Sequence, residues 1–221
     1  PETKLKSGTV LVVGLGNRGV TPDSLGPRVA ERVFVTRHIK EHMPEAFDFD
    51  IPSVCAIAPG VLGVTGVETM DIVFGVANKV KPDLIIAVDA LASRRAARIS
   101  TTIQLSDSGI SPGSGVGNTR ADLSRANLGV PVIAVGVPLV VYASTISQDT
   151  ISLIADETGL HGDEERLREL AEQVIAKHMG DFIVTPKDID VIVEDMAGII
   201  ANAINSALFG NNLEQVRNML A

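Results

Sequence analysis

The stretch VLVVGLGNRGVTPDSLGP, residues 10–27, decides the fold of this chain. It joins a β-branched apolar run, Val10–Val13, to a glycine-rich loop and then to the helix-start residues Thr21 and Pro22. A buried strand that ends in glycines and leads into a helix places polar groups at the carboxyl edge of a sheet, where open α/β proteins have their sites. Asp23 is the ionisable side chain that this stretch delivers to that edge.

A second apolar run, Leu84–Val88, is followed by Asp89. If the two strands are parallel neighbours, their carboxyl ends share one crevice and Asp23 lies near Asp89. Two carboxylates in one site have pKa values that move apart, so that near neutral pH one is protonated and the other ionised. Such a pair can activate a water molecule and protonate a leaving amine. The alternative is that each aspartate only caps the start of a helix or turn.

Apolar runs of strand length alternate with helical patterns along the chain. This order predicts a single α/β domain over residues 1–221, with a mostly parallel sheet covered by helices on both faces. The remaining strands are expected over 53–57, 101–105 (antiparallel or at an edge) and 130–137, where Pro138 stops the strand. Helices are expected over 28–43, from Thr65 (with Glu68 as a capping box) to Val80, over 167–175, and over 189–207 with Thr185 and Pro186 at its start; 156–165 is expected to be a loop.

Composition restricts the class of partner. The formal net charge of −8 argues against a nucleic-acid partner, because binding phosphates requires clustered Lys and Arg, and the longest basic cluster is Arg94, Arg95 and Arg98. The single cysteine, Cys55, excludes an internal disulfide and is typical of a reducing compartment. No apolar stretch of membrane-spanning length and no signal peptide is recognised, so no membrane partner is expected. The chain opens at Pro1 rather than Met, so we expect an N-terminal part of the natural product to be missing.

The glycine spacing Gly14, Gly16 and Gly19 matches the dinucleotide-binding fingerprint, but its context does not. Helix-start signals appear only at Thr21 and Pro22, after the third glycine, and the acidic residue expected at the end of the second strand is missing. We therefore predict no nucleotide cofactor.

Two further motifs are weak. The segment 109–113 fits the serine-hydrolase elbow, but Pro112 follows Ser111 and has no backbone N–H to donate to an oxyanion. His38 and His42 share one helix face without the three or four convergent ligands that a metal requires, so we predict a solvated face and no metal.

Taken together, the motifs resemble those of the germination proteases of spore-forming bacteria. The likeness covers most of the chain and is carried by residues 13–17, 20–23, 25–27, 35–38, 56–61, 63, 65, 66, 68, 81–83, 86–92, 112–118, 184–187 and 194–197.

This resemblance implies an endopeptidase with a phosphorylase/hydrolase-like α/β fold, made as a self-cleaving zymogen and assembled as a homotetramer. It implies small acid-soluble spore proteins as substrates, no cofactor, and a cytoplasmic location in the forespore and spore core. The family's two aspartates fall on Asp23 and Asp89, to which we assign water activation and leaving-group protonation jointly, since nothing in the sequence separates base from acid.

The chain also departs from the family pattern. The pro-segment has no counterpart, the stretch 156–165 is shorter than the family's insertion, and Leu139 and Tyr142 stand where a threonine and an aspartate are expected. Two alternatives stay open: a nickel-dependent endopeptidase of the hydrogenase-maturation type, although residues 111–117 lack the histidine it would need, and a non-catalytic spore protein on the same fold. Peptidyl-tRNA hydrolases share the glycine loop, but the chain lacks a basic face for RNA.

Overall fold

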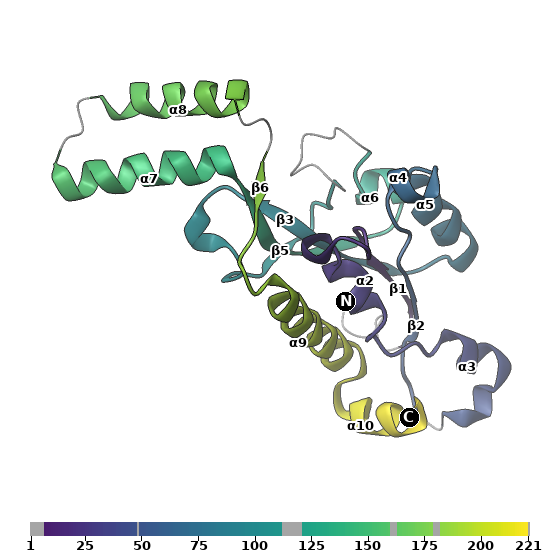
Figure 1. Cartoon of the computed structure of the whole chain (residues 1–221). Helices are drawn as coiled ribbons and strands as arrows, with labels where there is room; N and C mark the ends of the chain where they lie inside the picture. The colour runs from purple at the N-terminus through teal and green to yellow at the C-terminus, as the bar shows by residue number, and fades with distance from the viewer. Residues whose placement is uncertain (1–6, 48, 112–120, 160–162, 179–181, 221) are drawn as a thin grey trace.

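The computed structural model describes residues 7–47, 49–111, 121–159, 163–178 and 182–220 (Figure 1). Its elements in chain order are β1(Thr9–Gly14), η1(Thr21–Asp23), α2(Leu25–Ala30), α3(Arg37–His42), η2(Pro44–Ala46), β2(Ser53–Ile57), α4(Leu62–Thr65), α5(Thr69–Val80), β3(Leu84–Ser93), η3(Ala96–Arg98), β4(Gln104–Ser106), α6(Arg125–Leu128), β5(Val132–Tyr142), α7(Ala143–Thr158), α8(Glu164–His178), β6(Ile183–Val184), α9(Ile189–Phe209), η5(Gly210–Asn212) and α10(Leu213–Leu220), where η denotes a short 3-10 helix.

The strands form one mixed sheet in the order β2-β1-β3-β5-β4, with β6 also paired to β5. Strands β2, β1, β3 and β5 pair with one another in parallel, whereas β4 and β6 run antiparallel to β5. The predicted mostly parallel sheet is therefore confirmed, and so is the antiparallel edge strand after residue 100.

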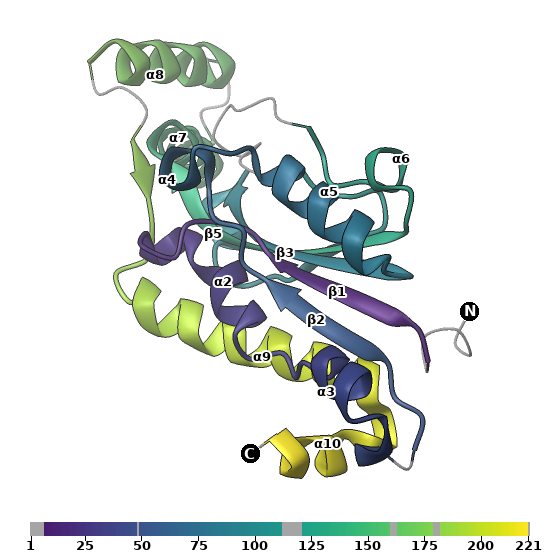
Figure 2. The ribbon, with the colours of Figure 1, turned by 90° about the vertical axis from the view of Figure 1, so that its right-hand side faces the viewer.

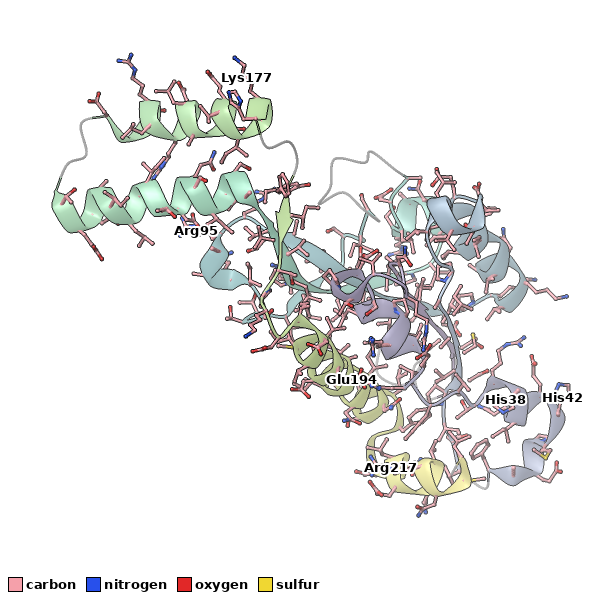
Figure 3. The ribbon with its side chains drawn as sticks, viewed as in Figure 1. His38, His42, Arg95, Lys177, Glu194 and Arg217 are labelled. Atoms are coloured by element: carbon pink, nitrogen blue, oxygen red, sulfur yellow. The ribbon has the colours of Figure 1, made fainter. Side chains whose placement is uncertain are left out.

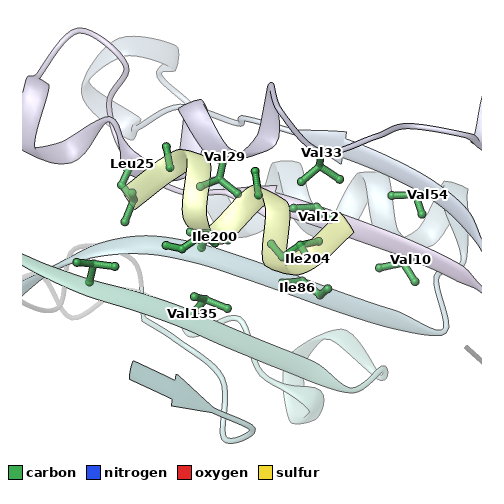
Figure 4. Close-up of a cluster of buried hydrophobic side chains, with 14 of the residues drawn as sticks. Val10, Val12, Leu25, Val29, Val33, Val54, Ile86, Val135, Ile200 and Ile204 are labelled. Atoms are coloured by element: carbon green, nitrogen blue, oxygen red, sulfur yellow. The ribbon is translucent and has the colours of Figure 1, made fainter. Parts of the chain in front are cut away.

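Helices cover both faces of the sheet, as predicted (Figure 2). Because side chains alternate along a strand, Val10 and Val12 pack into a core with α2 and α9 (Figure 4), whereas Leu11 and Val13 pack on the opposite face against α5. Both cores are almost entirely aliphatic, which agrees with an aromatic content of only 3%.

Helix α9 corrects one expectation. Among the described residues, the segment Ile189–Leu220 is long and apolar enough to span a membrane by length and composition. Its inward face, which includes Val193, Ala197 and Ile200, is buried against the sheet. Core helices of soluble proteins pass the same test, so this composition is weak evidence for a membrane.

A close crossing of backbones joins β1, α2 and β3. The amide of Leu15 donates to the carbonyl of Val88 at 2.8 Å, and Gly26 at the start of α2 lies against both residues. A Cβ on Gly26 would lie 2.2 Å from the Leu15 carbonyl oxygen and 2.5 Å from that of Val88, and a Cβ on Gly14 would lie 2.1 Å from the Gly26 oxygen. Only glycine fits at either position, and the crossing brings the turn η1 against β3.

The helix predicted over 28–43 is wrong, because the chain forms two short helices there, α2 and α3. Thr36 interrupts it: its amide donates to the Val54 carbonyl, and its buried hydroxyl donates to the Pro52 carbonyl and accepts from the Val54 amide. The β-branched run before Thr36 also disfavours a helix. These partners are distant in sequence, so local periodicity did not reveal them.

Both central strands are longer than predicted, since β3 continues through Ser93 and β5 passes through Pro138. Pro138 lies opposite Leu91, next to the point where the register between β3 and β5 shifts. On the other side of β5, Pro138 falls between the residues that pair with β4 and those that pair with β6. A proline is tolerated where the ladder is already interrupted.

The predicted helix starts are also wrong. Thr65 ends α4 rather than starting a helix, and its hydroxyl accepts from the Val67 amide. Helix α5 begins at Thr69 and ends at Val80, the end that was expected. The hydroxyl of Thr185 donates to the Leu139 carbonyl, and α9 begins only at Ile189. Helix α7 was not predicted, and it forms a helical pair with α8 that projects from the body (Figure 1).

Replacing Gly26 by alanine should destabilise the fold by about 3 kcal/mol, because the new methyl group meets backbone atoms that cannot move independently. Gly75→Ala is the matched control. Gly75 lies on the exposed face of α5 with open space around it, so alanine there should stabilise by about 0.5–1 kcal/mol. Urea denaturation measures both free energies of unfolding, and equal values for the two variants would contradict the crossing.

Candidate active site

Asp23 is the last residue of the turn η1, and the glycine loop after β1 wraps around it. The amide of Asn17 donates to Asp23 Oδ2 at 2.8 Å. Gly16 has a φ of +112°, and a Cβ there would lie 2.0 Å from the backbone oxygen of Asp23. The loop therefore needs glycine at position 16 both for its conformation and for its contact with Asp23.

This contact explains why a dinucleotide-like spacing occurs here. In a nucleotide-binding loop, backbone amides face a phosphate. Here the Asn17 amide instead donates to a carboxylate of the same chain. The side chain of Asn17 accepts from the Gly19 amide at 2.9 Å and closes the turn. The loop amide therefore holds an aspartate of the same chain.

Asp89 lies within β3 rather than at its end, which corrects the expected position. It pairs with Gly136 of β5, whereas β1 ends opposite Val88, so Asp89 is the first β3 residue beyond the end of β1. The residue is only 5% exposed, and its Oδ1 accepts from the Ala90 amide at 2.9 Å. The early end of β1 leaves room beside Asp89 for η1, which contacts β3.

The two predicted aspartates are brought together, and their charges interact. The pKa of Asp89 is raised to about 8, chiefly by burial and also by the negative charge of Asp23, while the Ala90 amide opposes the rise. Burial also raises the pKa of Asp23, against the lowering effect of the Asn17 amide. Near neutral pH Asp89 is therefore the more protonated member of the pair.

The other candidate residues lie elsewhere. His38 and His42 are exposed on α3 (Figure 3), as the solvated-face interpretation predicted. Cys55 is half-buried in β2, and burial raises its pKa, so it is no activated nucleophile. Among the described residues no group of three or more His, Cys, Asp and Glu side chains could hold a metal ion. Residues 112–120, which include Pro112 of the segment that resembles a serine-hydrolase elbow, lie outside the described residues.

The residues that brace the turn were not predicted from the sequence. Ser24, directly after Asp23, donates its hydroxyl to the Thr21 carbonyl and accepts from Nε of Arg28. Arg28 in turn pairs with Glu194 of α9, which Figure 3 labels. The four-residue spacing of Ser24 and Arg28 on one helix face was the only local signal, whereas Glu194 is remote in sequence and gave none.

Comparison with known proteins places these residues in a family. The family model for germination protease matches residues 3–165 and 157–219. The germination protease of Clostridium acetobutylicum is 49% identical over 90% of this chain and 65% of its own length. That of Caldanaerobacter subterraneus is 49% identical over 97% of this chain and 70% of its own length, and that of Bacillus cereus 43% identical over 92% and 67%.

The solved structures that this chain is similar to are more distant in sequence. A NiFe hydrogenase maturation protease from Thermococcus kodakarensis is 18% identical, with a TM-score of 0.45 over 91% of this chain and 96% of that one. The hydrogenase maturating endopeptidase HybD from E. coli is 17% identical, with a TM-score of 0.34 over 81% and 99%. The present chain spans about two thirds of the length of the curated relatives that it matches, and 65% of the length of the C. acetobutylicum protein. From the family model and the extent of these identities, the chain belongs to the germination protease family.

Proposed function

We propose that this chain is an endopeptidase in which Asp23 and Asp89 act together on a water molecule. The observation that carries the proposal is the electrostatic interaction of a buried carboxyl in β3 with a second carboxylate held by the glycine loop, in a chain of the germination protease family. Hydrolysing a peptide bond requires a base for the water and an acid for the leaving amine, and a one-proton carboxyl pair supplies both.

The environments of the two carboxyls divide the roles. Asp23 is partly exposed and accepts the Asn17 amide, which favours its ionised form, so it takes the proton of the attacking water. Asp89 is buried beside that negative charge and holds its proton to about pH 8, so it protonates the departing nitrogen. After the amine leaves, transfer of the proton from Asp23 to Asp89 restores the starting state.

The proposed substrates are small acid-soluble spore proteins, and the proposed assembly is a homotetramer. The family supports a protein substrate, and exposed apolar side chains on the α7–α8 pair support self-association. These side chains are Leu153, Ile154, Leu167, Leu170 and Val174. A cytoplasmic location in the forespore and spore core, without a nucleic-acid or membrane partner, completes the proposal.

Asp23→Asn and Asp89→Asn should each lower cleavage of a small acid-soluble spore protein by at least about 100-fold, because each removes one half of the proton transfer. Circular dichroism should show both variants folded. The matched control is Asp71→Asn on the exposed face of α5, which should leave the rate unchanged. Full activity in both site variants would leave the non-catalytic alternative, or another nucleophile.

The pH dependence of stability tests the buried state of Asp89. Its folded-state pKa of about 8 lies above the ordinary value of 3.8, so its contribution to stability is fully present below about pH 4 and is lost as the pH rises through 8. Each pKa unit corresponds to about 1.4 kcal/mol, so urea denaturation should show the wild-type free energy of unfolding falling between pH 5 and pH 8 more steeply than that of Asp89→Asn. Parallel slopes would mean that Asp89 titrates normally.

Removal of metal distinguishes the proposal from the nickel-dependent alternative. Dialysis against EDTA should leave kcat within about twofold, and added Ni²⁺ should not increase it, because the proposed reaction uses carboxyl groups alone. Loss of activity on dialysis with recovery on adding Ni²⁺ would favour the hydrogenase-maturation type of reaction.

A further inference from the structure

The hydroxyl of Ser24 ties the turn that carries Asp23 to helix α2. Ser24 is fully buried and occupies the N-cap position of α2, yet its side chain makes no cap hydrogen bond to that helix. The hydroxyl instead donates to the Thr21 carbonyl at 2.8 Å and accepts from Arg28 Nε at 3.0 Å. The Thr21 carbonyl also accepts from the Ser24 amide at 3.1 Å, so both bonds close η1 at the residue after Asp23.

Arg28 extends this connection to α9. Its Nη1 donates to Glu194 Oε2 at 2.5 Å, so the two ends of one guanidinium bind Ser24 and Glu194. Arg32, four residues after Arg28, binds the same glutamate. Its guanidinium pairs with the Glu194 carboxylate, and its Nη1 donates to the Glu194 backbone carbonyl at 2.9 Å. Helix α9 packs against both η1 and α2, which makes it a common support for the turn.

The geometry of this connection favours a role in orientation rather than in global stability. The side chains of Arg28 and Glu194 are 35% and 46% exposed, and ion pairs as exposed as this contribute little to folding free energy. The planar guanidinium, in contrast, fixes direction, because it binds two partners at once from a defined position. Its inner partner is the buried hydroxyl adjacent to Asp23.

We propose that Ser24 and Arg28, anchored by Glu194, are positioning residues that hold η1 so that the Asp23 carboxylate faces Asp89. This inference rests on the proposed peptidase activity. Small displacements of a reacting group can lower a rate by about 100-fold, so a relaxed turn should impair the chemical step more than substrate binding.

Three variants distinguish the effect of the Ser24–Arg28 hydrogen bond from that of the ion pairs with Glu194. Ser24→Ala removes the hydroxyl with little change in volume. Arg28→Lys keeps a positive charge for Glu194 but loses the Nε donor to Ser24. Arg32→Met is the matched control, because the Arg32 side chain binds the same glutamate and its hydrogen bonds among the described residues are to α9 alone.

Two readouts are measured on each folded variant. Ser24→Ala and Arg28→Lys should lower kcat about tenfold with KM within about twofold, whereas Arg32→Met should keep kcat within about twofold. The second readout is the titration of the Asp23 carboxyl by carbon NMR, assigned with Asp23→Asn. Because the Asn17 amide lowers the pKa of Asp23, loosening of η1 in the first two variants should raise that pKa, while Asp89 still faces it from β3.

The outcomes are distinct. An unchanged kcat and an unchanged Asp23 titration in Ser24→Ala and Arg28→Lys would overturn the inference. Equal losses of activity in all three variants, in proportion to their melting temperatures, would also overturn it and leave a purely structural ion pair. If the wild-type chain cleaves no spore protein, the proposed function fails instead, and the Asp23 titration alone decides whether the turn is held as inferred.

Discussion

The organisation of this molecule depends on one steric constraint, the crossing of three backbone segments without intervening side chains. Gly14 and Gly26 allow the end of β1 and the start of α2 to lie directly against each other and against Val88 of β3. Any Cβ there would separate the turn η1 from the sheet. The crossing thus sets the position of Asp23 relative to Asp89 before any polar interaction contributes.

Electrostatics then determine the chemistry of the two carboxyl groups. Asp89 lies deep in the sheet next to a like charge, and within the described part of the chain the amide of its neighbour Ala90 alone offsets the cost of ionising it. Asp23 has the Asn17 amide and partial access to solvent. The same residue type therefore has two proton affinities because the fold places its two copies at different depths.

The sequence predicted the parts of this arrangement that have local causes. Alternating apolar strands and helices were sufficient for the α/β class and for bringing Asp23 near Asp89, although Asp89 lies within β3 and not at its end. The break at Thr36 and the continuation of β5 through Pro138 were not predictable, because both depend on partners in other strands. The ion pair between Arg28 and Glu194 was not predictable for the same reason, since no periodicity in the sequence links α2 to α9.

The parallel pairing of β1 with β3 has a consequence for the time at which the site forms during synthesis. Asp23 leaves the ribosome early, but its partner Asp89 belongs to a strand that pairs on its other side with β5, which is made later still. A nascent or truncated polypeptide that lacks these later strands contains one ordinary carboxylate and no proton-sharing partner. The topology therefore delays the formation of the carboxyl pair until the central sheet has assembled.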